Sequence, residues 1–271
     1  MIFWLKGRLS ALFRVLLMNR PTQNSFTRRH VLSASAATLV GGLAVQGRQA
    51  QAQSKSPSLK KGDVILFQGD SITDARRDKK RQGSPNDAAA LGLGYPLLLG
   101  SQLLADHPEL DLKIYNRGIS GHKVPQLDAR WQEDCLDLKP AILSILVGVN
   151  DMWHKLNGKY DGTVADYGDQ FAALIQRTRK ALPKVRIVVC DPFVLKCGAI
   201  NDKWFPEFTE RRALAKKVAD DAATDFVPFQ SMFDQAVAAG TEPAYWARDG
   251  VHPTPAGHAL MAKTWRKVGG V

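Results

Sequence analysis

From Lys60 to the carboxyl terminus, short apolar runs alternate with longer segments in which apolar residues recur every three or four positions. Most of the short runs are continuously apolar, which is typical of strands buried on both faces of a parallel sheet. They predict five strands, at 64–68, 112–116, 141–147, 185–190 and 225–229. The longer segments predict helices, at 95–106, 124–136, 164–182, 205–223, 231–239 and 255–268.

This alternation of strands and helices predicts the fold class. Strands separated by helices form a parallel sheet with right-handed crossovers, so that helices cover both faces. We therefore expect an α/β fold, a three-layer α/β/α sandwich with a five-stranded parallel sheet in the flavodoxin-like strand order 2-1-3-4-5. No internal repeat or linker is visible, so residues 53–271 are expected to form one domain.

In such a sheet, ligands bind beyond the carboxyl ends of the strands. Three predicted strands end in polar or glycine-rich segments, and a fourth such segment precedes the last predicted helix. These segments are Gly69-Asp70-Ser71-Ile72-Thr73-Asp74, Asn116-Arg117-Gly118-Ile119-Ser120-Gly121, Gly148-Val149-Asn150-Asp151 and Asp249-Gly250-Val251-His252-Pro253. All four are expected to meet at one edge of the sheet.

The first 52 residues have a different character. Arg28 and Arg29 directly precede an Ala/Gly-rich, weakly apolar stretch over 31–45, and Ala50-Gln51-Ala52 has the A-x-A pattern of a cleavage site. This layout predicts a twin-arginine export signal over 1–52, with Met18 as an alternative start, and a periplasmic or secreted mature chain. A membrane anchor is the alternative, although the apolar stretch is shorter than the ~20 residues that a span needs.

Most of the net positive charge belongs to the first 52 residues, so it says little about the function of the remaining chain. The net charge of the 271 residues is +11, but residues 1–52 hold seven Lys or Arg and no Asp or Glu. The remaining chain holds 30 basic and 26 acidic residues, so no nucleic-acid partner is expected.

The three cysteines of the remaining chain, Cys135, Cys190 and Cys197, cannot all pair with one another, and a Cys190–Cys197 disulfide stays open at this point.

Ser71, Asp249 and His252 are the candidate catalytic residues. A serine hydroxyl needs a base to become a nucleophile, and His252 can serve as that base. Asp249, three residues before it, can reach the imidazole Nδ1, fix its tautomer and stabilise the imidazolium that forms. Taken alone, Ser71 also fits a helix N-cap and the Asp249/His252 pair a loop hydrogen bond. Their placement at the same predicted edge favours catalysis.

Acyl transfer also needs donors for the developing oxyanion. The backbone N–H groups of Ser71 and Gly118 and the side-chain amide of Asn150 are the candidates, although Asn150-Asp151 also fits a simple turn. The G-x-S-x-G elbow of α/β-hydrolases is absent around Ser71, which disfavours that fold.

Together these residues resemble the four ordered blocks of the SGNH, or GDSL, hydrolase family, over residues 69–258. The blocks are Gly69-Asp70-Ser71, Gly118, Gly148-x-Asn150-Asp151 and Asp249-x-x-His252. The resemblance implies that Ser71 is the nucleophile, His252 the base and Asp249 its partner, with Ser71, Gly118 and Asn150 as oxyanion donors. It also implies ester hydrolysis through an acyl-enzyme, without a metal or other cofactor.

Further segments, including Leu93-Gly94-Tyr95, Arg130-Trp131-x-x-Asp134 and Gly257-His258, make the chain similar to bacterial single-domain acetylxylan esterases. It departs from them at His122, where asparagine is common, and at Arg248, directly before the aspartate of the last block. The implied substrate is a small ester or an acetylated carbohydrate.

Candidate substrate contacts are Asp70, His122, Trp153 and Trp246. Trp131 fits a packing residue within a helix better than a sugar-binding one. The basic segment at the start of 76–92 fits a solvated charge run, with a flap over an acidic polysaccharide as the alternative.

Other functions stay open at this stage. A lipid-type acylhydrolase or thioesterase would use the same chemistry, a metal-dependent hydrolase would use Asp70, Asp74, Asp249 and His252, and a carbohydrate-binding protein would have the fold without turnover. The expected partners are the substrate and, during export, the twin-arginine translocon. A homo-oligomer is compatible with the sequence.

Overall fold

The computed structural model describes residues 59–271, so the predicted export signal lies outside the described residues. Five strands form one parallel sheet in the order β2-β1-β3-β4-β5, which confirms the predicted order. The strands are β1 (Val64–Gly69), β2 (Lys113–Asn116), β3 (Ile142–Leu146), β4 (Arg186–Cys190) and β5 (Asp225–Val227).

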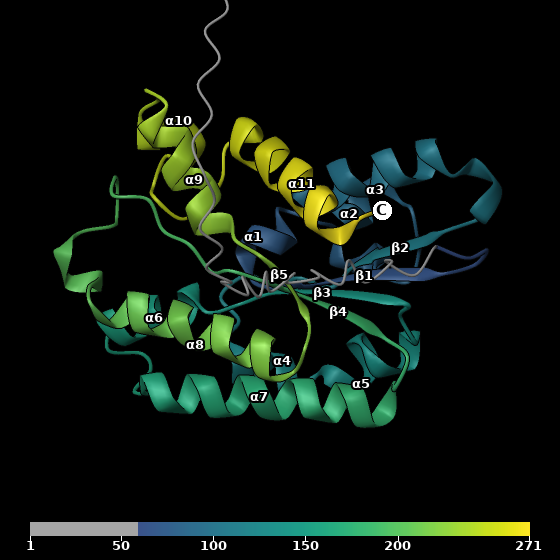
Figure 1. Cartoon of the computed structure of the whole chain (residues 1–271), viewed down its shortest axis with the longest axis horizontal. Coiled ribbons are helices and arrows are strands. Elements are labelled where there is room, and N and C mark those ends of the chain that lie inside the picture. The colour runs from purple at the N-terminus through teal and green to yellow at the C-terminus, as the bar shows by residue number, and fades with distance from the viewer. Residues whose placement is uncertain (1–58) are drawn as a thin grey trace, which may run out of the picture. The chain divides into compact units, whose positions relative to one another are not determined.

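Helices cover both faces of the sheet, as predicted (Figure 1). One face packs against α3 (Tyr95–Asp106), α9 (Phe229–Ala238) and α11 (Pro255–Gly269), and the other against α4 (Val124–Ala129), α5 (Trp131–Asp134), α7 (Val164–Ala181) and α8 (Glu207–Asp221). Shorter helices α1 (Ser71–Asp74), α2 (Ala88–Leu91), α6 (Val149–Leu156) and α10 (Pro243–Trp246) lie in the connections. Single 3-10 turns occupy Lys79–Arg81, Pro108–Leu110, Leu136–Leu138 and Asp202–Trp204. No helix within 59–271 combines the length and apolarity of a bilayer span.

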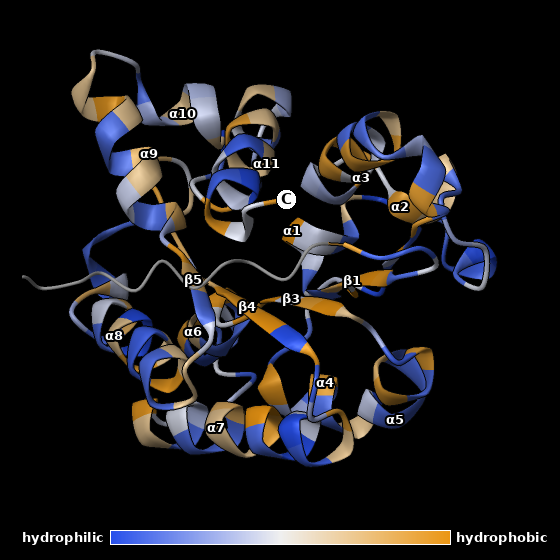
Figure 2. Ribbon diagram, turned by 45° about the vertical axis from the view of Figure 1, so that its right-hand side comes forward, coloured by the Kyte–Doolittle hydropathy of each residue, from blue (hydrophilic) through white to orange (hydrophobic). Residues whose placement is uncertain are grey.

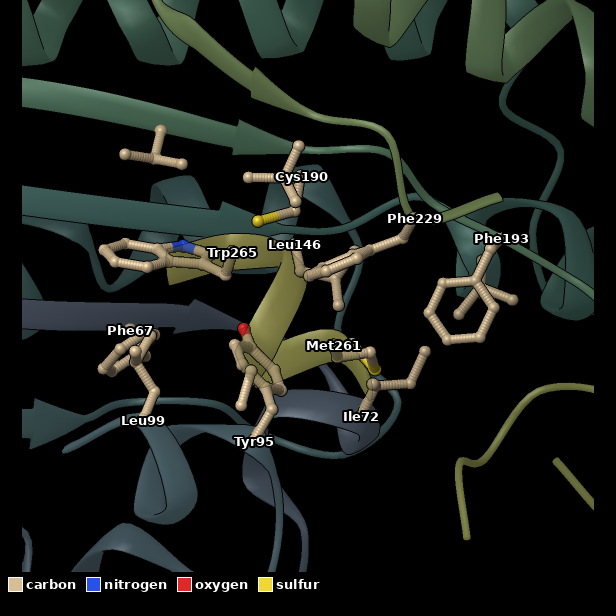
Figure 3. Close-up of a cluster of buried hydrophobic side chains, with 14 of the residues drawn as sticks. Phe67, Ile72, Tyr95, Leu99, Leu146, Cys190, Phe193, Phe229, Met261 and Trp265 are labelled. Atoms are coloured by element: carbon tan, nitrogen blue, oxygen red, sulfur yellow. The ribbon is translucent and has the colours of Figure 1, made fainter. Parts of the chain in front are cut away.

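The central strands consist mostly of apolar residues (Figure 2), because each face of the sheet has its own core. Phe67 of β1 points to the α3/α11 side, where it packs against Tyr95 and Trp265 at ring-centroid distances of 5.6 and 5.8 Å (Figure 3). Leu66, its neighbour in the strand, belongs to the opposite core together with Trp131. This alternation of side chains explains why the strands read as continuous apolar runs.

Two predicted elements are different in the structure. The expected helix over 124–136 is broken at Arg130, whose φ and ψ of −110° and 8° separate α4 from α5. The break turns Trp131 into the core, where its Nε1–H donates to Thr178 Oγ1 at 2.9 Å. The predicted strand at 225–229 ends at Val227, because Phe229 already begins α9.

The three cysteines are free thiols, so the structure contains no Cys190–Cys197 bridge. Cys135 and Cys190 are buried, and burial raises the pKa of Cys135 above its ordinary range and that of Cys190 to about 12. These two thiols therefore stay protonated and act as apolar packing groups.

Candidate active site

Ser71, His252 and Asp249 are joined by hydrogen bonds at the carboxyl edge of the sheet. Ser71 begins α1 directly after β1, and His252 lies in the loop before α11. Ser71 Oγ lies 2.8 Å from His252 Nε2, and His252 Nδ1 lies 2.6 Å from Asp249 Oδ2. Because the carboxylate accepts the Nδ1 proton, Nε2 is free to accept the proton of the serine hydroxyl.

The Asp249 carboxylate is itself held by the backbone. Its Oδ1 accepts the N–H of Val251 at 3.0 Å and that of His252 at 2.8 Å. Partial burial would raise the pKa of Asp249, but the hydrogen bonds from His252 and Val251 outweigh it and keep the pKa below its usual value. Asp249 is therefore ionised beside the imidazole at neutral pH.

Close packing around Gly69, the last residue of β1, fixes the position of Ser71 two residues later. A Cβ at Gly69 would lie 2.4 Å from both Leu146 O and Thr73 Oγ1, so only glycine fits before Asp70. Asp70 then caps α1, with its Oδ1 accepting the N–H of Ile72 at 2.9 Å. This is the helix-capping arrangement that Asp commonly makes at an N-terminus.

Asp70 is buried, 1% exposed, which contradicts its assignment as a substrate contact. Burial is the largest cause that raises the pKa of Asp70 to about 7, and the neighbouring Asp151 carboxylate adds to it. Burial also raises the pKa of Asp151, to about 6. Asp70 Oδ2 and both Asp151 carboxylate oxygens have no hydrogen-bond partner within 59–271. These two acids are buried and do not line the cavity at Ser71.

Asn150, the third candidate oxyanion donor, is buried near the backbone of His122. It lies in the first turn of α6, which begins after Gly148, a residue with φ of +134° that few side chains tolerate. One amide hydrogen of Asn150 is directed at the backbone oxygen of His122, at an Nδ2···O distance of 3.3 Å. The contact orients the amide and leaves its second hydrogen for a ligand.

Gly118 is not placed as an oxyanion donor. Its N–H donates to Asn116 Oδ1 at 2.9 Å, and a Cβ there would lie 2.4 Å from the backbone N of Asp74. The lack of a side chain at Gly118 thus allows close packing against α1, and its N–H is already used within the protein. This finding corrects the assignment made from the sequence.

Gly121, three residues later in the same segment, has the features that Gly118 lacks. It is half-buried with φ of +82°, and a Cβ there would meet only His154, at 3.8 Å. Within 59–271, no acceptor lies in hydrogen-bond range of the backbone N–H of Gly121 or of Ser71. Its neighbour Ser120 lines the same cavity as Ser71 and is tied to α1, because Asp74 Oδ2 accepts its N–H and Oγ–H at 3.0 and 2.7 Å.

A charged cluster that was not predicted lies behind this segment. Arg130 donates to Asp134 Oδ2 at 2.9 Å and to His122 Nδ1 at 3.2 Å, and Arg117 donates to Asp134 Oδ1 at 3.1 Å. Burial, followed by the nearby Arg130 and Lys123 charges, lowers the pKa of His122 to about 4. His122 is therefore neutral, with its remaining proton on Nε2.

The candidate tryptophans are placed differently from one another. Trp153 packs edge-on against Trp204 at 5.7 Å and lies 6.0 Å from the His252 ring, and it does not line the cavity at Ser71, contrary to expectation. Trp246 donates its Nε1–H to Thr241 at 2.7 Å and does not line the cavity at Ser71, contrary to expectation. Trp131 is fully buried.

A cavity of about 660 Å³ opens at Ser71 and His252. Its wall combines polar and charged side chains with an apolar set made up of Ile72, Ala75, Leu93, Pro253 and Pro255. A second cavity, of about 520 Å³, lies around Val64, Ile142 and Arg186, where β1, β3 and β4 begin. Because it lies at the amino ends of the strands, away from every candidate catalytic side chain, we place the chemistry at the first cavity.

Within 59–271, no three His, Cys, Asp or Glu side chains are grouped as a metal site would require. Of the four residues considered as ligands, Asp74 is buried and paired with Lys79 at 2.9 Å, and Asp249 is hydrogen-bonded to His252.

Comparison with known proteins gives consistent matches over most of the described residues. A model of the GDSL-like lipase/acylhydrolase family matches residues 67–260. The acetylxylan esterase of Geobacillus stearothermophilus is 33% identical over 211 residues, covering 77% of this chain and 94% of that protein. Its crystal structure matches with a TM-score of 0.69 at 32% identity, covering 79% of this chain and 96% of the other.

A crystal structure from Parabacteroides merdae, described as a GDSL-like lipase, matches with a TM-score of 0.76 at 48% identity, covering 79% of this chain and 98% of that one. Variants of the Geobacillus esterase described as catalytic replace a serine, an aspartate and a histidine, the last two spaced three residues apart. A further variant of that esterase replaces the tryptophan immediately before this aspartate.

Proposed function

Because this chain belongs to the GDSL-like lipase/acylhydrolase family and is a carboxylic ester hydrolase, we propose that it is an exported serine esterase that removes acetyl groups from carbohydrates. The observation that carries the proposal is the pair of hydrogen bonds from Ser71 through His252 to Asp249 at the mouth of a cavity. The aspartate and histidine have the three-residue spacing of the catalytic pair in the Geobacillus esterase.

The geometry supports an acyl-enzyme mechanism. Ser71 Oγ attacks the ester carbonyl while its proton passes to His252 Nε2, and Asp249 stabilises the imidazolium. His252 then returns the proton to the leaving sugar hydroxyl as the tetrahedral intermediate collapses. A water molecule, deprotonated by the same imidazole, attacks the acyl-enzyme and releases the acid and free Ser71.

Three donors support the negatively charged intermediate in this proposal. They are the backbone N–H groups of Ser71 and Gly121 and the side-chain amide of Asn150. The two N–H groups are unused within 59–271, and Asn150 is oriented by His122 O. Donors fixed before the reaction stabilise developing charge without the cost of reorganisation.

The cavity wall offers polar groups to a sugar beside a small apolar set, Ile72, Ala75, Leu93, Pro253 and Pro255, that suits a short acyl group. Ser120, Thr254 and two arginines lie among the residues that line it. A long acyl chain would bind on a continuous apolar surface, where each buried methylene group contributes about 0.8 kcal/mol to the binding free energy. A lipid-type acylhydrolase or thioesterase is the alternative, and a non-catalytic carbohydrate-binding protein is a second one.

Export through the twin-arginine translocon to the periplasm or beyond is part of the proposal. It rests on Arg28-Arg29, the apolar stretch after them and Ala50-Gln51-Ala52. The free thiols are compatible with this route, because a substrate of this translocon folds in the reducing cytoplasm, where disulfides are rare.

The test is hydrolysis of p-nitrophenyl esters from acetate to palmitate, with EDTA present throughout. We expect a steep preference for acetate and a loss of about 10⁴–10⁶-fold in kcat/KM on Ser71→Ala. Ser231→Ala, an exposed serine on α9, is the matched control. A preference for long chains would favour the lipid alternative, loss of activity in EDTA would favour a metal enzyme, and no Ser71-dependent turnover would leave the binding protein.

A further inference from the structure

Two arginines line the catalytic cavity, one from each of the segments that carry the catalytic residues. Arg76 follows α1, which begins with Ser71, and Arg248 directly precedes Asp249. Both side chains are exposed, and neither makes an ion pair or a side-chain hydrogen bond with any residue from 59 to 271. Two guanidinium groups are therefore available to a ligand at the mouth of the site.

The backbone around Arg76 is fixed in an unusual conformation. Ala75 and Arg76 have φ of 41° and 63°, the left-handed region that residues with a Cβ seldom adopt. Ala75 O accepts the N–H of Leu93 at 2.8 Å, and the next residue, Arg77, is buried with its Nε donating to Gly118 O at 2.7 Å. Backbone strain of this kind is concentrated at ligand-binding sites, where the surrounding structure maintains it.

Arg248 is held just as closely. Ala247, before it, is fully buried and forms a bridge with Pro253, and Asp249, after it, is bound to His252. A Cβ at Gly198 would lie 2.9 Å from Arg248 O, so the neighbouring loop packs directly against this backbone. The side chain of Arg248 thus extends from a fixed point beside the catalytic imidazole.

The carboxylates near these arginines are already used. Asp249 is engaged by His252, and the buried Asp74 is engaged by Lys79 and Ser120. The remaining histidine of the wall, His258, is neutral, because burial lowers its pKa to about 4. The wall therefore carries an excess of positive charge, although the chain after residue 52 is nearly balanced in charge.

Resting on the proposed function, we propose that the carbohydrate substrate carries a carboxylate, as a uronic acid does, beside the acylated sugar. Arg76 and Arg248 would bind this carboxylate while Ser71 attacks the acyl ester. A guanidinium matches a carboxylate with two parallel hydrogen bonds, which fixes orientation as well as affinity. Arg248 immediately precedes the aspartate, where the Geobacillus esterase has a tryptophan, so the two cavities differ in charge at this point.

The experiment measures acetate release from acetylated xylo-oligosaccharides that bear glucuronic acid, and from the same oligosaccharides after methyl esterification of that acid. The readout is the ratio of kcat/KM for the free acid to that for the methyl ester, in the full-length protein. Because the ratio is internal to each variant, it does not depend on how much of the variant folds. We expect a ratio of about ten or more in the wild type, arising mainly in KM.

Arg76→Gln and Arg248→Gln are each expected to lower this ratio about threefold, and the double variant to bring it close to one. Lys80→Gln, at an exposed residue of the same basic segment that does not line the cavity, should leave the ratio unchanged. A wild-type ratio near one, or a double variant that keeps the wild-type ratio, would overturn the proposal. So would acetate release from neither oligosaccharide by a protein that still hydrolyses p-nitrophenyl acetate through Ser71. Loss of that Ser71-dependent hydrolysis would refute the proposed function instead.

Discussion

Replacement of Asp70 by asparagine is expected to stabilise the protein above pH 4 to an extent that grows with pH. The asparagine side chain would keep the Oδ1 acceptor for the Ile72 N–H, which lies 2.9 Å away, and asparagine caps helices about as well as aspartate. What the substitution removes is a carboxylate whose pKa is about 7 in the folded chain because it is buried next to Asp151. The effect therefore comes from ionisation and not from a lost contact.

The sign and size follow from proton linkage. Between the ordinary value of 3.8 and about 7, Asp70 is ionised in the unfolded chain but protonated in the folded one. The folded state then binds more protons, so the wild-type free energy of unfolding falls as the pH rises through this window. At about 1.36 kcal/mol per pH unit, the loss relative to Asp70→Asn reaches on the order of 4 kcal/mol near pH 7 and stays constant above it.

Urea unfolding followed by tryptophan fluorescence, at intervals from pH 4.5 to 8, measures this difference. Subtracting the two proteins at each pH cancels the titration of the groups that do not interact with Asp70. Asp78→Asn is the matched control, because Asp78 also caps a helical turn, through the Lys80 N–H at 3.0 Å, but is exposed. A wild-type-minus-variant difference that is flat over the window would show that Asp70 is not held protonated by burial, and the reasoning would fail.

Two further predictions concern the oxyanion donors and their support. Asn150→Ala should lower kcat for p-nitrophenyl acetate about 10²–10³-fold with a smaller change in KM, measured in steady state; a change confined to KM would contradict the donor role. Arg130→Gln removes a positive charge 3.2 Å from His122 Nδ1, so the pKa of His122, which NMR titration of its ring protons measures, should rise from about 4, although burial keeps it below its ordinary value. The same variant should lower kcat about three- to tenfold, because His122 O orients Asn150; an unchanged His122 titration would show that the Arg130 contact has no electrostatic effect.

Much of the fold was predictable because burial on both faces leaves a strong signal in the strands. Leu143 and Ile145 pack into one core, and Ile142 and Leu146 into the other, so β3 reads as an apolar run interrupted only by Ser144. Helix α6 was not predicted, because its eight residues follow a glycine and begin with Val149-Asn150-Asp151, which fits a turn equally well. Its helical conformation depends on the positive φ of Gly148, and the sequence does not reveal that angle.

The candidate catalytic residues and the proposed oxyanion donors differ in how far the sequence determines them. Ser71, Asp249 and His252 are identified by side-chain chemistry, which the sequence displays directly. Gly118 and Gly121 have the same N–H and the same absence of a side chain, and they differ in backbone conformation and in what surrounds them. The Asn116 side chain occupies the N–H of Gly118, and α1 packs against its Cα. Such a distinction requires the fold.

The cluster behind His122 shows a partly predictable case. Arg130 and Asp134 are four residues apart, a spacing that brings oppositely charged side chains together on a helix. Arg117 reaches the same carboxylate from the end of β2, and that contact depends on the sheet order. The Arg130–Asp134 pair was therefore predictable from the sequence, whereas the contact of Arg117 with Asp134 became visible only in the tertiary structure.

Several groups that are costly to bury lie near the candidate catalytic residues. Asp70, Asp74 and Asp151 each have a buried carboxylate oxygen without a hydrogen-bond partner within 59–271, and all three follow β1 or β3 at the catalytic edge. The left-handed Ala75 and Arg76 follow directly after α1. Natural proteins give up stability in this way where function requires a fixed arrangement of charges. The stabilisation expected from Asp70→Asn thus measures how much free energy of unfolding the protein loses by burying the Asp70 carboxyl group next to Ser71. A loss of kcat in the same variant would link that cost to catalysis.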